Sequence, residues 1–404
     1  MPRAWLLGGL AAMAPDLDVL IRSETDPLLA IEHHRGFTHA LAFIPVGGLL
    51  TALPWLTRSW ARARWGAVVA TTTAGYATHG LLDACTSYGT RLLWPSAHRV
   101  AWDVISIIDP LFTLMLLVGL VWAVWSRSRA PAAVALTVCA LYLGLGALQR
   151  ERAMAAQARI AAARGHTPDR GAVFPAVGSH LVWRSLYRVG ERLHADRIRV
   201  SWLGVVQWAG GSELQAVSER EMAGADARVL AAFRRFRWFA ADWTVRAPAD
   251  PSWIADARYS LRMDVYDPIW GIRFHPGRPV PIEWVDRSRE RRLAFRELWA
   301  ELAGTHPAYR PLPGASSDST RQPKRSRSLE GMEGIVRLAA GRPDDAARSA
   351  AALARRPGAG GAQARSLGAP AARGDRVSLR GLHRTCGSLR RKDGGAFHPG
   401  FWPS

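Results

Sequence analysis

The sequence predicts a mostly α-helical protein with a multi-spanning membrane helical bundle over residues 1–150, a small soluble α+β domain over 151–313 and a disordered tail over 314–404. Three features predict this division. Apolar runs crowd the first part, whereas β-branched and aromatic residues in partial alternation mark the second. The tail is rich in alanine, glycine, arginine and serine, and such a composition buries too little apolar surface to offset the entropy lost on ordering.

Five apolar runs in the first part are expected to form its helices. Residues 37–56 have about membrane length, and residues 111–125 carry no charge, which favours membrane helices over the buried helices of a large soluble domain. Residues 66–82 are rich in small side chains, which let membrane helices approach closely. The runs are residues 4–14, 37–56, 66–82, 110–125 and 131–148.

The first run superficially resembles a signal peptide, but Asp16 and Asp18 follow it directly and no clear cleavage pattern is present. It holds eleven residues, fewer than the roughly 17–25 that cross a bilayer. We therefore expect a retained short membrane helix whose natural upstream part is missing.

Basic residues in the connecting segments predict the orientation of the bundle. Arginines lie between the second and third runs and again between the fourth and fifth, and the positive-inside tendency makes that side cytoplasmic. These are Arg58, Arg62, Arg64, Arg127 and Arg129, while Arg150 and Arg152 run against the rule. The opposite, extracytoplasmic face then collects Asp16, Asp18, His33, His34, His39, His79, Asp83, Asp103 and Asp109.

The second part reads as an α+β domain between about residues 166 and 312. It lies on the same side of the membrane as the polar residues, where we expect it to cover their site or to shape access to it. Strands are expected in residues 183–202, 238–247, 253–264 and 268–274, and a charged amphipathic helix in residues 287–302.

The net charge of +20 would ordinarily suggest nucleic acid or an anionic membrane surface as a partner. The tail alone holds 17 lysines and arginines against 7 acidic residues, so it carries about half of the excess. Nucleic-acid binding through this tail is therefore the least favoured function. Cys85, Cys139 and Cys386 show no metal-type or redox-type spacing.

Two short stretches carry the candidate chemistry. His79 and Asp83 stand four residues apart and share one face of a helix, where both can hold one ion or the aspartate can orient the histidine. His34 and His39 stand five apart, which suits a turn entering a helix. Each pair alone also occurs by chance. The stretches are residues 32–39, Glu-His-His-Arg-Gly-Phe-Thr-His, and residues 78–83, Thr-His-Gly-Leu-Leu-Asp.

Two further carboxylates, Asp16 and Asp18, precede these stretches at the end of an apolar run. On an extended segment they point to opposite sides. One is then expected to be a ligand, while the other caps a helix or pairs with Arg22 or Arg35.

Oxygen and imidazole donors without thiols, on one face of a membrane bundle, favour a divalent metal ion, zinc first and manganese as the alternative. One or two ions would activate a water for hydrolysis, and the carboxylate of Asp18 would take the proton. Arg35 would pair an anionic phosphate or balance an aspartate. Asp103 is a further functional candidate, whereas Asp109 before a proline predicts an ordinary helix start.

At these residues the chain resembles the YdjM-like family of inner-membrane-associated, metal-dependent hydrolases, which are also described as LexA-binding. The resemblance covers about residues 4–148 and rests on motifs in a fixed order. These are Pro15-Asp-Leu-Asp-Val-Leu20, His34-Arg-Gly-Phe-Thr-His39, and His79-Gly-Leu-Leu-Asp83 followed by Tyr88-Gly-Thr-Arg-Leu-Leu-Trp-Pro95.

The resemblance implies a bacterial inner-membrane location. It also implies a metal-ligand set by position: Asp16, Asp18, His34, His39, His79 and Asp83. The family is more distantly similar to zinc-dependent prokaryotic phospholipase C, which favours phosphoester hydrolysis. Members usually begin with an additional helix that opens Met-Asp-x-x-Thr-His or Thr-Gln, and this sequence departs from that pattern.

The sequence thus predicts a multi-pass inner-membrane hydrolase whose metal-activated water attacks a phosphoester or a lipid-derived small molecule, with the site on the extracytoplasmic face. The alternative is a non-catalytic membrane scaffold or regulatory binding protein, in which the polar clusters only hold helices together. The two differ in whether His79→Ala removes metal and activity while the fold stays intact.

Overall fold

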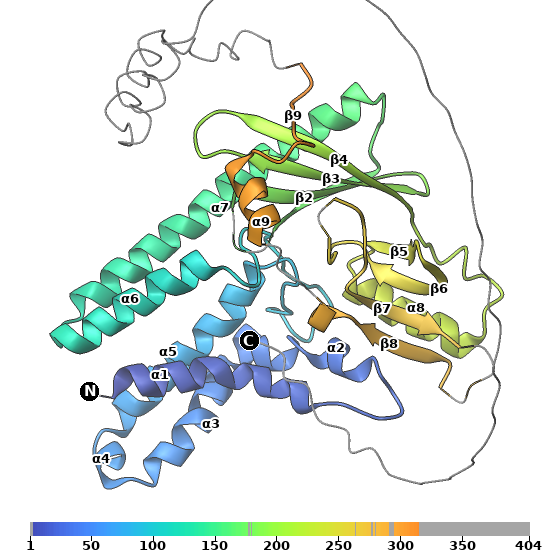
Figure 1. Cartoon of the computed structure of the whole chain (residues 1–404). Coiled ribbons are helices and arrows are strands. Elements are labelled where there is room, and N and C mark those ends of the chain that lie inside the picture. The colour runs from blue at the N-terminus through green and yellow to red at the C-terminus, as the bar shows by residue number, and fades with distance from the viewer. Residues whose placement is uncertain are drawn as a thin grey trace, which may run out of the picture. The chain divides into compact units, whose positions relative to one another are not determined.

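The computed structural model describes residues 3–314, apart from residues 177, 179, 263, 276, 277, 279 and 291–294. A helical N-terminal region is followed by a strand-rich part (Figure 1), which confirms the predicted order of fold types. Its five longest N-terminal helices each overlap one of the five apolar runs, although the run expected as one helix over residues 37–56 begins with two 3-10 turns and is α-helical only from Ile44. These helices are α1 (Ala4–Met13), α3 (Ile44–Leu56), α5 (Trp65–Ala84), α6 (Pro110–Ser126) and α7 (Ala130–Ala163).

Small residues hold α1, α3 and α5 together. A Cβ on Gly75 of α5 would lie 2.2 Å from the carbonyl oxygen of Gly8 in α1. The hydroxyl of Thr72 in α5 donates to the Gly48 carbonyl of α3 at 2.8 Å. Backbones approach this closely only where side chains are small, so the glycine- and threonine-rich composition of α5 has the packing role expected of it.

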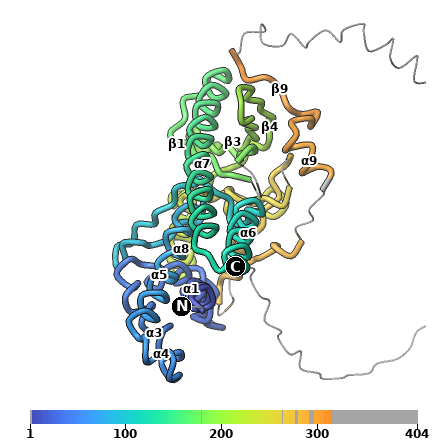
Figure 2. Tube along the Cα trace, turned by 90° about the vertical axis from the view of Figure 1, so that its left-hand side faces the viewer, coloured from blue at the N-terminus to red at the C-terminus, as the bar shows by residue number. Residues whose placement is uncertain are grey.

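The helix α7 is a single element in two environments. Its first part, through Leu148, pairs with α6 and carries no charged residue. Its last part packs on the sheet, where Ala156 and Ile160 meet Trp183 in one apolar cluster (Figure 2). The helix end expected at Leu148 and the domain boundary expected after residue 150 therefore fall inside α7. The alanine-rich residues after Leu148 are less hydropathic, but one face of the helix remains buried against the sheet, so the helix continues to Ala163.

Two antiparallel sheets make up the second part, in the strand orders β1-β2-β3-β4-β9 and β5-β6-β7-β8. The helix α8 (Ala227–Phe239) buries Phe233 and Phe236 against the second sheet. The remaining elements are β1 (Arg170–Pro175), β2 (Val182–Val189), β3 (Arg192–Val200), β4 (Val206–Gln215), β5 (Thr244–Ala247), β6 (Asp250–Asp256), β7 (Trp270–Phe274), β8 (Ile282–Asp286), α9 (Phe295–Ala303) and β9 (Arg310–Pro311).

The α+β prediction is correct in kind and incomplete in detail. All four expected stretches contain strands, but Trp238 belongs to the end of α8 because the apolar spacing of that helix continues to Phe239. The charged helix expected in residues 287–302 is a 3-10 turn, Ser288–Glu290, followed by α9. The predicted disordered tail falls, from residue 315 onward, outside the described residues.

The number of membrane spans is smaller than the sequence predicted. Among the described residues, α7 is the one helix both long and apolar enough to cross a membrane, and the segments Leu29–His39 and Leu41–Leu56 qualify as a pair bent by 61°. The helix α1 has 10 residues and α6 has 17. The helix α5 is long enough, but its threonines, histidine and aspartate reduce its hydropathy.

Candidate metal centre

Three segments of the helical region converge at one end of α5. The first is η1 (Ala14–Leu20), a 3-10 helix that continues α1. Asp16 and Asp18 therefore do not lie on an extended segment as expected, because Pro15 at the start presets a helical φ. The second segment runs from α2 (Leu29–His33) through η2 (Phe37–His39), and the third is the last turn of α5.

The turn between α2 and η2 is fixed by the carboxylate of Asp18. Its Oδ2 accepts a hydrogen bond from the Arg35 backbone N–H at 3.0 Å and another from the Thr38 hydroxyl at 2.7 Å. Arg35 itself is in the left-handed region, with a φ of 65°. This turn brings the rings of His34 and His39 to 5.8 Å between centroids, so the expected turn is present and both rings face the same site.

Gly80 allows α5 to touch η2. A Cβ on Gly80 would lie 2.3 Å from the carbonyl oxygen of His39, so only glycine permits this approach of the two backbones. The contact sets His79 and Asp83, on either side of Gly80 along α5, against the imidazole of His39.

We expect Gly80→Ala to reduce the free energy of unfolding by about 1–3 kcal/mol, because the added methyl group pushes η2 and α5 apart. Gly66→Ala is the matched control on the same helix, since a Cβ there meets nothing within 4 Å. The control should be neutral or stabilising by up to about 1 kcal/mol, as alanine is the better helix former. Thermal unfolding of the full chain in detergent measures both changes, and equal shifts would contradict the close approach.

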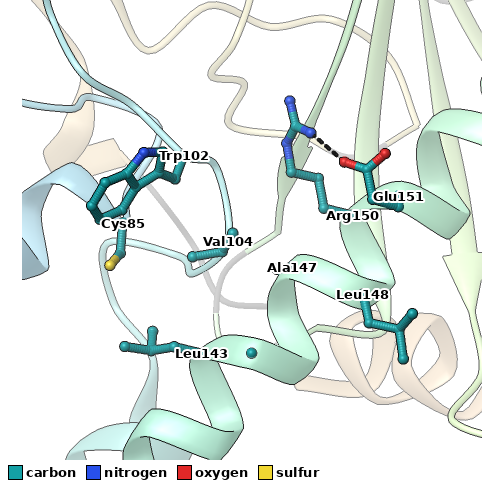
Figure 3. A pocket seen from close by; sticks show the side chains of 9 residues that line it. Cys85, Trp102, Val104, Leu143, Ala147, Leu148, Arg150 and Glu151 are labelled. Carbon is teal, nitrogen blue, oxygen red and sulfur yellow. Dashed lines mark hydrogen bonds and ion pairs between the residues drawn. The ribbon is translucent and has the colours of Figure 1, made fainter.

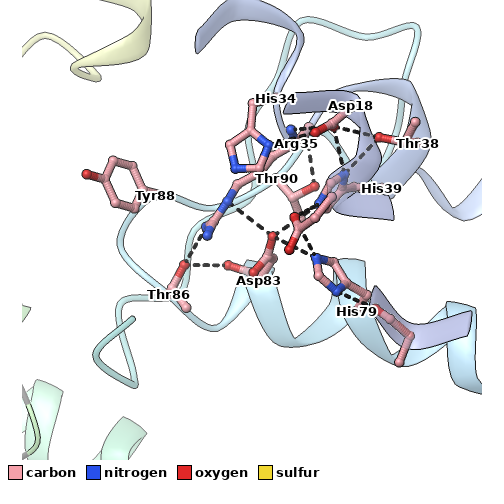
Figure 4. A network of polar contacts seen from close by, with 12 residues as sticks. Asp18, His34, Arg35, Thr38, His39, His79, Asp83, Thr86, Tyr88 and Thr90 are labelled. Atoms are coloured by element: carbon pink, nitrogen blue, oxygen red, sulfur yellow. Dashed lines mark hydrogen bonds and ion pairs between the residues drawn. The ribbon is translucent and has the colours of Figure 1, made fainter. Parts of the chain in front are cut away.

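All six residues expected as ligands come together in this region (Figure 4). Four of them place one donor atom each toward a common point. From the Nε2 atom of His39, the Oδ1 atom of Asp16 and the Oδ2 atom of Asp83 both lie 3.4 Å away. From the Nε2 atom of His79, the same two oxygens lie 3.1 and 3.7 Å away.

These four of the six donor-to-donor separations are compatible with tetrahedral placement around one zinc ion. Ligand distances of about 2.0–2.2 Å imply edges of about 3.3–3.6 Å between neighbouring donor atoms, and the four measured edges scatter around this range. Two of the donors, the Nε2 atom of His39 and the Oδ2 atom of Asp83, are buried and make no well-aligned hydrogen bond among the described residues, although they lie 3.4 Å from each other and the Nε atom of Arg35 lies 3.2 Å from the second. Buried polar atoms of this kind usually have a partner, and a metal ion would supply it.

The opposite nitrogen of each imidazole is already held. The Nδ1 atom of His79 donates to the Ala12 carbonyl oxygen at 2.6 Å, and the Nδ1 atom of His39 lies 3.3 Å from the Oδ2 atom of Asp18. Such contacts fix the tautomer that leaves Nε2 free for a metal. Sequence reasoning missed the Ala12 carbonyl, and no sequence signal could have found it, because every residue carries one.

The other two expected ligands form an adjacent pair. The Nδ1 atom of His34 lies 2.7 Å from the Oδ1 atom of Asp18, and with Asp16 these residues form a second group of potential ligands. The Asp18 side chain is fully buried, whereas about a third of the His34 side chain is exposed. His34 is therefore the member of this pair that solvent or a substrate can reach.

Arg35 closes the site on its remaining side. Its Nε atom lies 3.2 Å from the Oδ2 atom of Asp83, and its Nη1 atom donates to the Thr86 hydroxyl. The guanidinium lies over the ring of Tyr88, which Figure 4 shows beside it. Tyr88 in turn stacks on Tyr259 from the strand-rich part at 4.6 Å between centroids. The second part therefore reaches the neighbourhood of the site through Tyr259, whereas its expected role in covering the site or shaping access to it stays a prediction.

The aspartates and His39 stabilise each other's charged forms. Burial alone would disfavour those forms, but hydrogen bonds from the site histidines hold the pKa values of Asp16 and Asp18 below their usual range. For His39, burial lowers the pKa, yet the close carboxylates of Asp16, Asp18 and Asp83 outweigh it and raise the pKa to about 10.

This raised pKa predicts a pH-dependent metal affinity. In metal-free protein the protonated His39 stabilises the fold fully below the unfolded pKa of about 6.5, and this contribution is lost as the pH rises through about 10. Metal binding must release that proton, so zinc affinity should rise about tenfold per pH unit between these limits. Competition with a chelator over this range measures it, and a flat profile would contradict the assignment of His39 as a ligand.

Three further residues from the sequence analysis lie outside the ligand groups. His33 contributes no donor atom to either group of described residues. Asp109 caps α6 by accepting from the Phe112 N–H at 2.9 Å, which confirms the predicted helix start. Asp103 has a left-handed φ of 54°, and burial raises its pKa to about 6, but it does not join the metal donors.

Comparison with known proteins supports the resemblance read from the motifs. Residues 2–153 match the family model described as YdjM inner membrane protein. The Escherichia coli (strain K12) protein named Inner membrane protein YbcI is 34% identical over 111 residues, which are 26% of this chain and 63% of that relative. The chain thus spans less than two thirds of the length of the curated relative. No solved structure matches it significantly.

Proposed function

We propose, from the match of its N-terminal part to an inner-membrane family, that this protein is a membrane-bound, metal-dependent hydrolase. The observation that carries the proposal is the set of four converging donor atoms from Asp16, His39, His79 and Asp83, two of them buried without a well-aligned hydrogen bond among the described residues. An oxygen and imidazole set at tetrahedral spacing favours zinc, with manganese as the alternative. Bound there, the ion would polarise an ester oxygen and acidify a water molecule.

The residues around these donors suit the remaining steps of hydrolysis. His34 is partly exposed and its Nδ1 atom is held by Asp18, which is the arrangement of an oriented general base. We therefore assign proton acceptance to His34 and orientation to Asp18, whose own oxygens are already occupied by His34, Arg35, Thr38 and His39. The guanidinium of Arg35 lies beside Asp83, where it can pair with an anionic phosphoester.

Membrane insertion is supported by the apolar surface of the hairpin formed by α6 and α7. The large side chains of Leu114, Val121, Leu136 and Leu141 are each more than half exposed, and a soluble monomer rarely shows so large an apolar patch. We propose that α6 and α7 insert into the bilayer together with the group of α1, α3 and α5, with α7 as the helix long enough to cross it. The arginine-rich connections then lie on the cytoplasmic side and the metal centre on the extracytoplasmic side.

One observation favours the scaffold alternative. The four donors would fill all tetrahedral positions, which is typical of a structural zinc, whereas catalytic sites keep a position open. The catalytic reading requires a fifth position, or a second ion in the neighbouring group of Asp16, Asp18 and His34.

Elemental analysis of the detergent-purified full chain, followed by an assay with a chromogenic phosphodiester, separates these functions. The hydrolase is supported if the protein holds stoichiometric zinc or manganese and shows metal-dependent hydrolysis. His34→Gln should then abolish hydrolysis while the metal is retained. Stoichiometric metal without hydrolysis of any phosphoester in the screen supports the scaffold. Folded protein that takes up no metal from excess ions contradicts both the metal centre and the hydrolase.

A further inference from the structure

A cavity of about 670 Å³ lies between α7 and the segment that follows α5. Figure 3 shows Cys85, Trp102 and Val104 on one side of it and Leu143, Ala147 and Leu148 of α7 on the other. Its volume falls within the range of about 300–1,000 Å³ that is typical of small-molecule sites. The metal donors do not line it, so the metal centre leaves this cavity unexplained.

The polar groups of the cavity are at one end only. The ion pair between Arg150 and Glu151 at 2.7 Å follows directly after the uncharged part of α7. The Nε atom of Arg150 is buried and has no hydrogen-bond partner among the described residues. A ligand that fills this cavity would therefore need a long apolar body and one anionic group at its end.

The position of the cavity along α7 indicates where that ligand comes from. The flanking side chains of Leu141 and Leu148 are 70% and 58% exposed, so apolar surface continues from the cavity outward along the helix. Trp102 is about half exposed at the level where the charges begin, as aromatic residues are at a membrane interface. In the bilayer placement proposed above, on which this inference rests, the cavity opens where hydrocarbon meets headgroups.

We propose that this cavity, named here the α7 cavity, binds one acyl chain of an anionic bilayer phospholipid, with the headgroup phosphate at Arg150. The mostly apolar lining and the exposed apolar helix surface beside it favour a lipid over a soluble ligand, and the guanidinium favours an anionic headgroup over a zwitterionic one. This site goes beyond the proposed hydrolase, since lipid occupancy needs no metal ion.

Gly144 offers a way to fill the α7 cavity. A Cβ at this position meets nothing within 4 Å, so the indole of Gly144→Trp can enter the cavity without displacing backbone. Leu141→Trp is the matched control, because it places the same side chain on the exposed face of the same helix. Ala147→Trp is a second filling variant, should Gly144→Trp fail to fold.

The test uses phosphatidylglycerol with a photoactivatable group in one acyl chain, incorporated with the full chain into vesicles. Peptide mapping should find adducts on the cavity segments around Trp102 and Leu143, and excess unlabelled phosphatidylglycerol should suppress them. Gly144→Trp should lower this labelling about tenfold, the effect of displacing roughly two methylene groups, while Leu141→Trp leaves it unchanged. Labelling spread evenly along α6 and α7, or equal in both variants, would overturn the proposal.

The predicted preference for an anionic headgroup is tested by comparing labelling by phosphatidylglycerol with labelling by phosphatidylcholine that carries the same photoactivatable acyl chain. Wild-type protein should prefer phosphatidylglycerol, and Arg150→Gln should reduce that preference about fivefold, as expected for the loss of one basic residue at an anionic surface. Equal labelling of wild-type protein by both lipids would overturn the role of Arg150. Lipid labelling should be the same in protein from which metal has been removed by a chelator. Loss of the lipid site can therefore be distinguished from loss of the metal centre.

Discussion

His79→Ala should lower zinc affinity by more than about a hundredfold, because it removes one of four donors from a site whose outer-shell partners alone are worth about 10–100-fold. The Nε2 atom of His79 is 3.1 Å from the Oδ1 atom of Asp16, and no other described imidazole can take its place from α5. Asp18→Asn should cost less, within the outer-shell range, because Asp18 is not one of the four donors and acts on them by orienting His39. Isothermal titration of chelated, detergent-solubilised protein measures these affinities.

The matched control is His33→Ala, which removes an imidazole from the same motif without touching either ligand group. It should bind zinc as wild-type protein does. If His79→Ala and His33→Ala bind zinc equally well, the four-donor centre is wrong. Thermal unfolding of the metal-free proteins excludes a simple loss of folding as the cause.

The second large effect is expected at the buried ion pair of Arg258 and Asp256. Both side chains are at most 2% exposed, and Arg258 also donates to the backbone carbonyls of Ser87 and Phe239. Arg258→Met leaves the Asp256 carboxylate buried without its main partner, which should cost about 3–5 kcal/mol. Denaturant unfolding of the full chain measures this loss.

The control for this change is Arg262→Met, four residues further along the chain. Arg262 pairs with Asp264 at 2.7 Å, but both side chains are about half exposed, so its loss should leave stability unchanged. A similar loss of stability in both variants would contradict the assigned importance of burial. Because Arg258 holds the Ser87 carbonyl next to Tyr88, its loss should also disturb the stacking partner of Arg35.

The helical region and the grouping of the six candidate residues were predictable because their signals are local. Long apolar runs report helices directly, and aspartates and histidines at the ends of such runs are costly unless they pair or bind. The turn at residues 34–39 followed from histidine spacing. The 3-10 conformation of η1 was not predicted. Asp16 and Asp18 were assigned to an extended segment, although Pro15 favours a helical start.

The errors in the second part arise where packing between distant segments, rather than a local signal, determines the structure. The continuation of α7 to Ala163 and the helix α8 are both held by packing against sheets, and neither stands out in a hydropathy profile. Each strand pairs with its neighbours in sequence, except that β9 pairs with β4 about a hundred residues earlier, and composition alone does not reveal that distant pairing. The division of roles between Asp18 and His34 also needed distances, since both residue types can be ligand, base or orienter.

The distribution of the metal donors along the chain has a consequence for the protein's lifetime. Asp16 and His79 are 63 residues apart, so an ion held by both acts as a clip that closes a long loop, at a chain-entropy cost that grows only slowly with length. Metal at about a hundred times its dissociation constant would add about 2.7 kcal/mol to stability. For a marginally stable chain, such a gain alters the fraction exposed to proteases. Cellular abundance of this protein should therefore follow the supply of its metal.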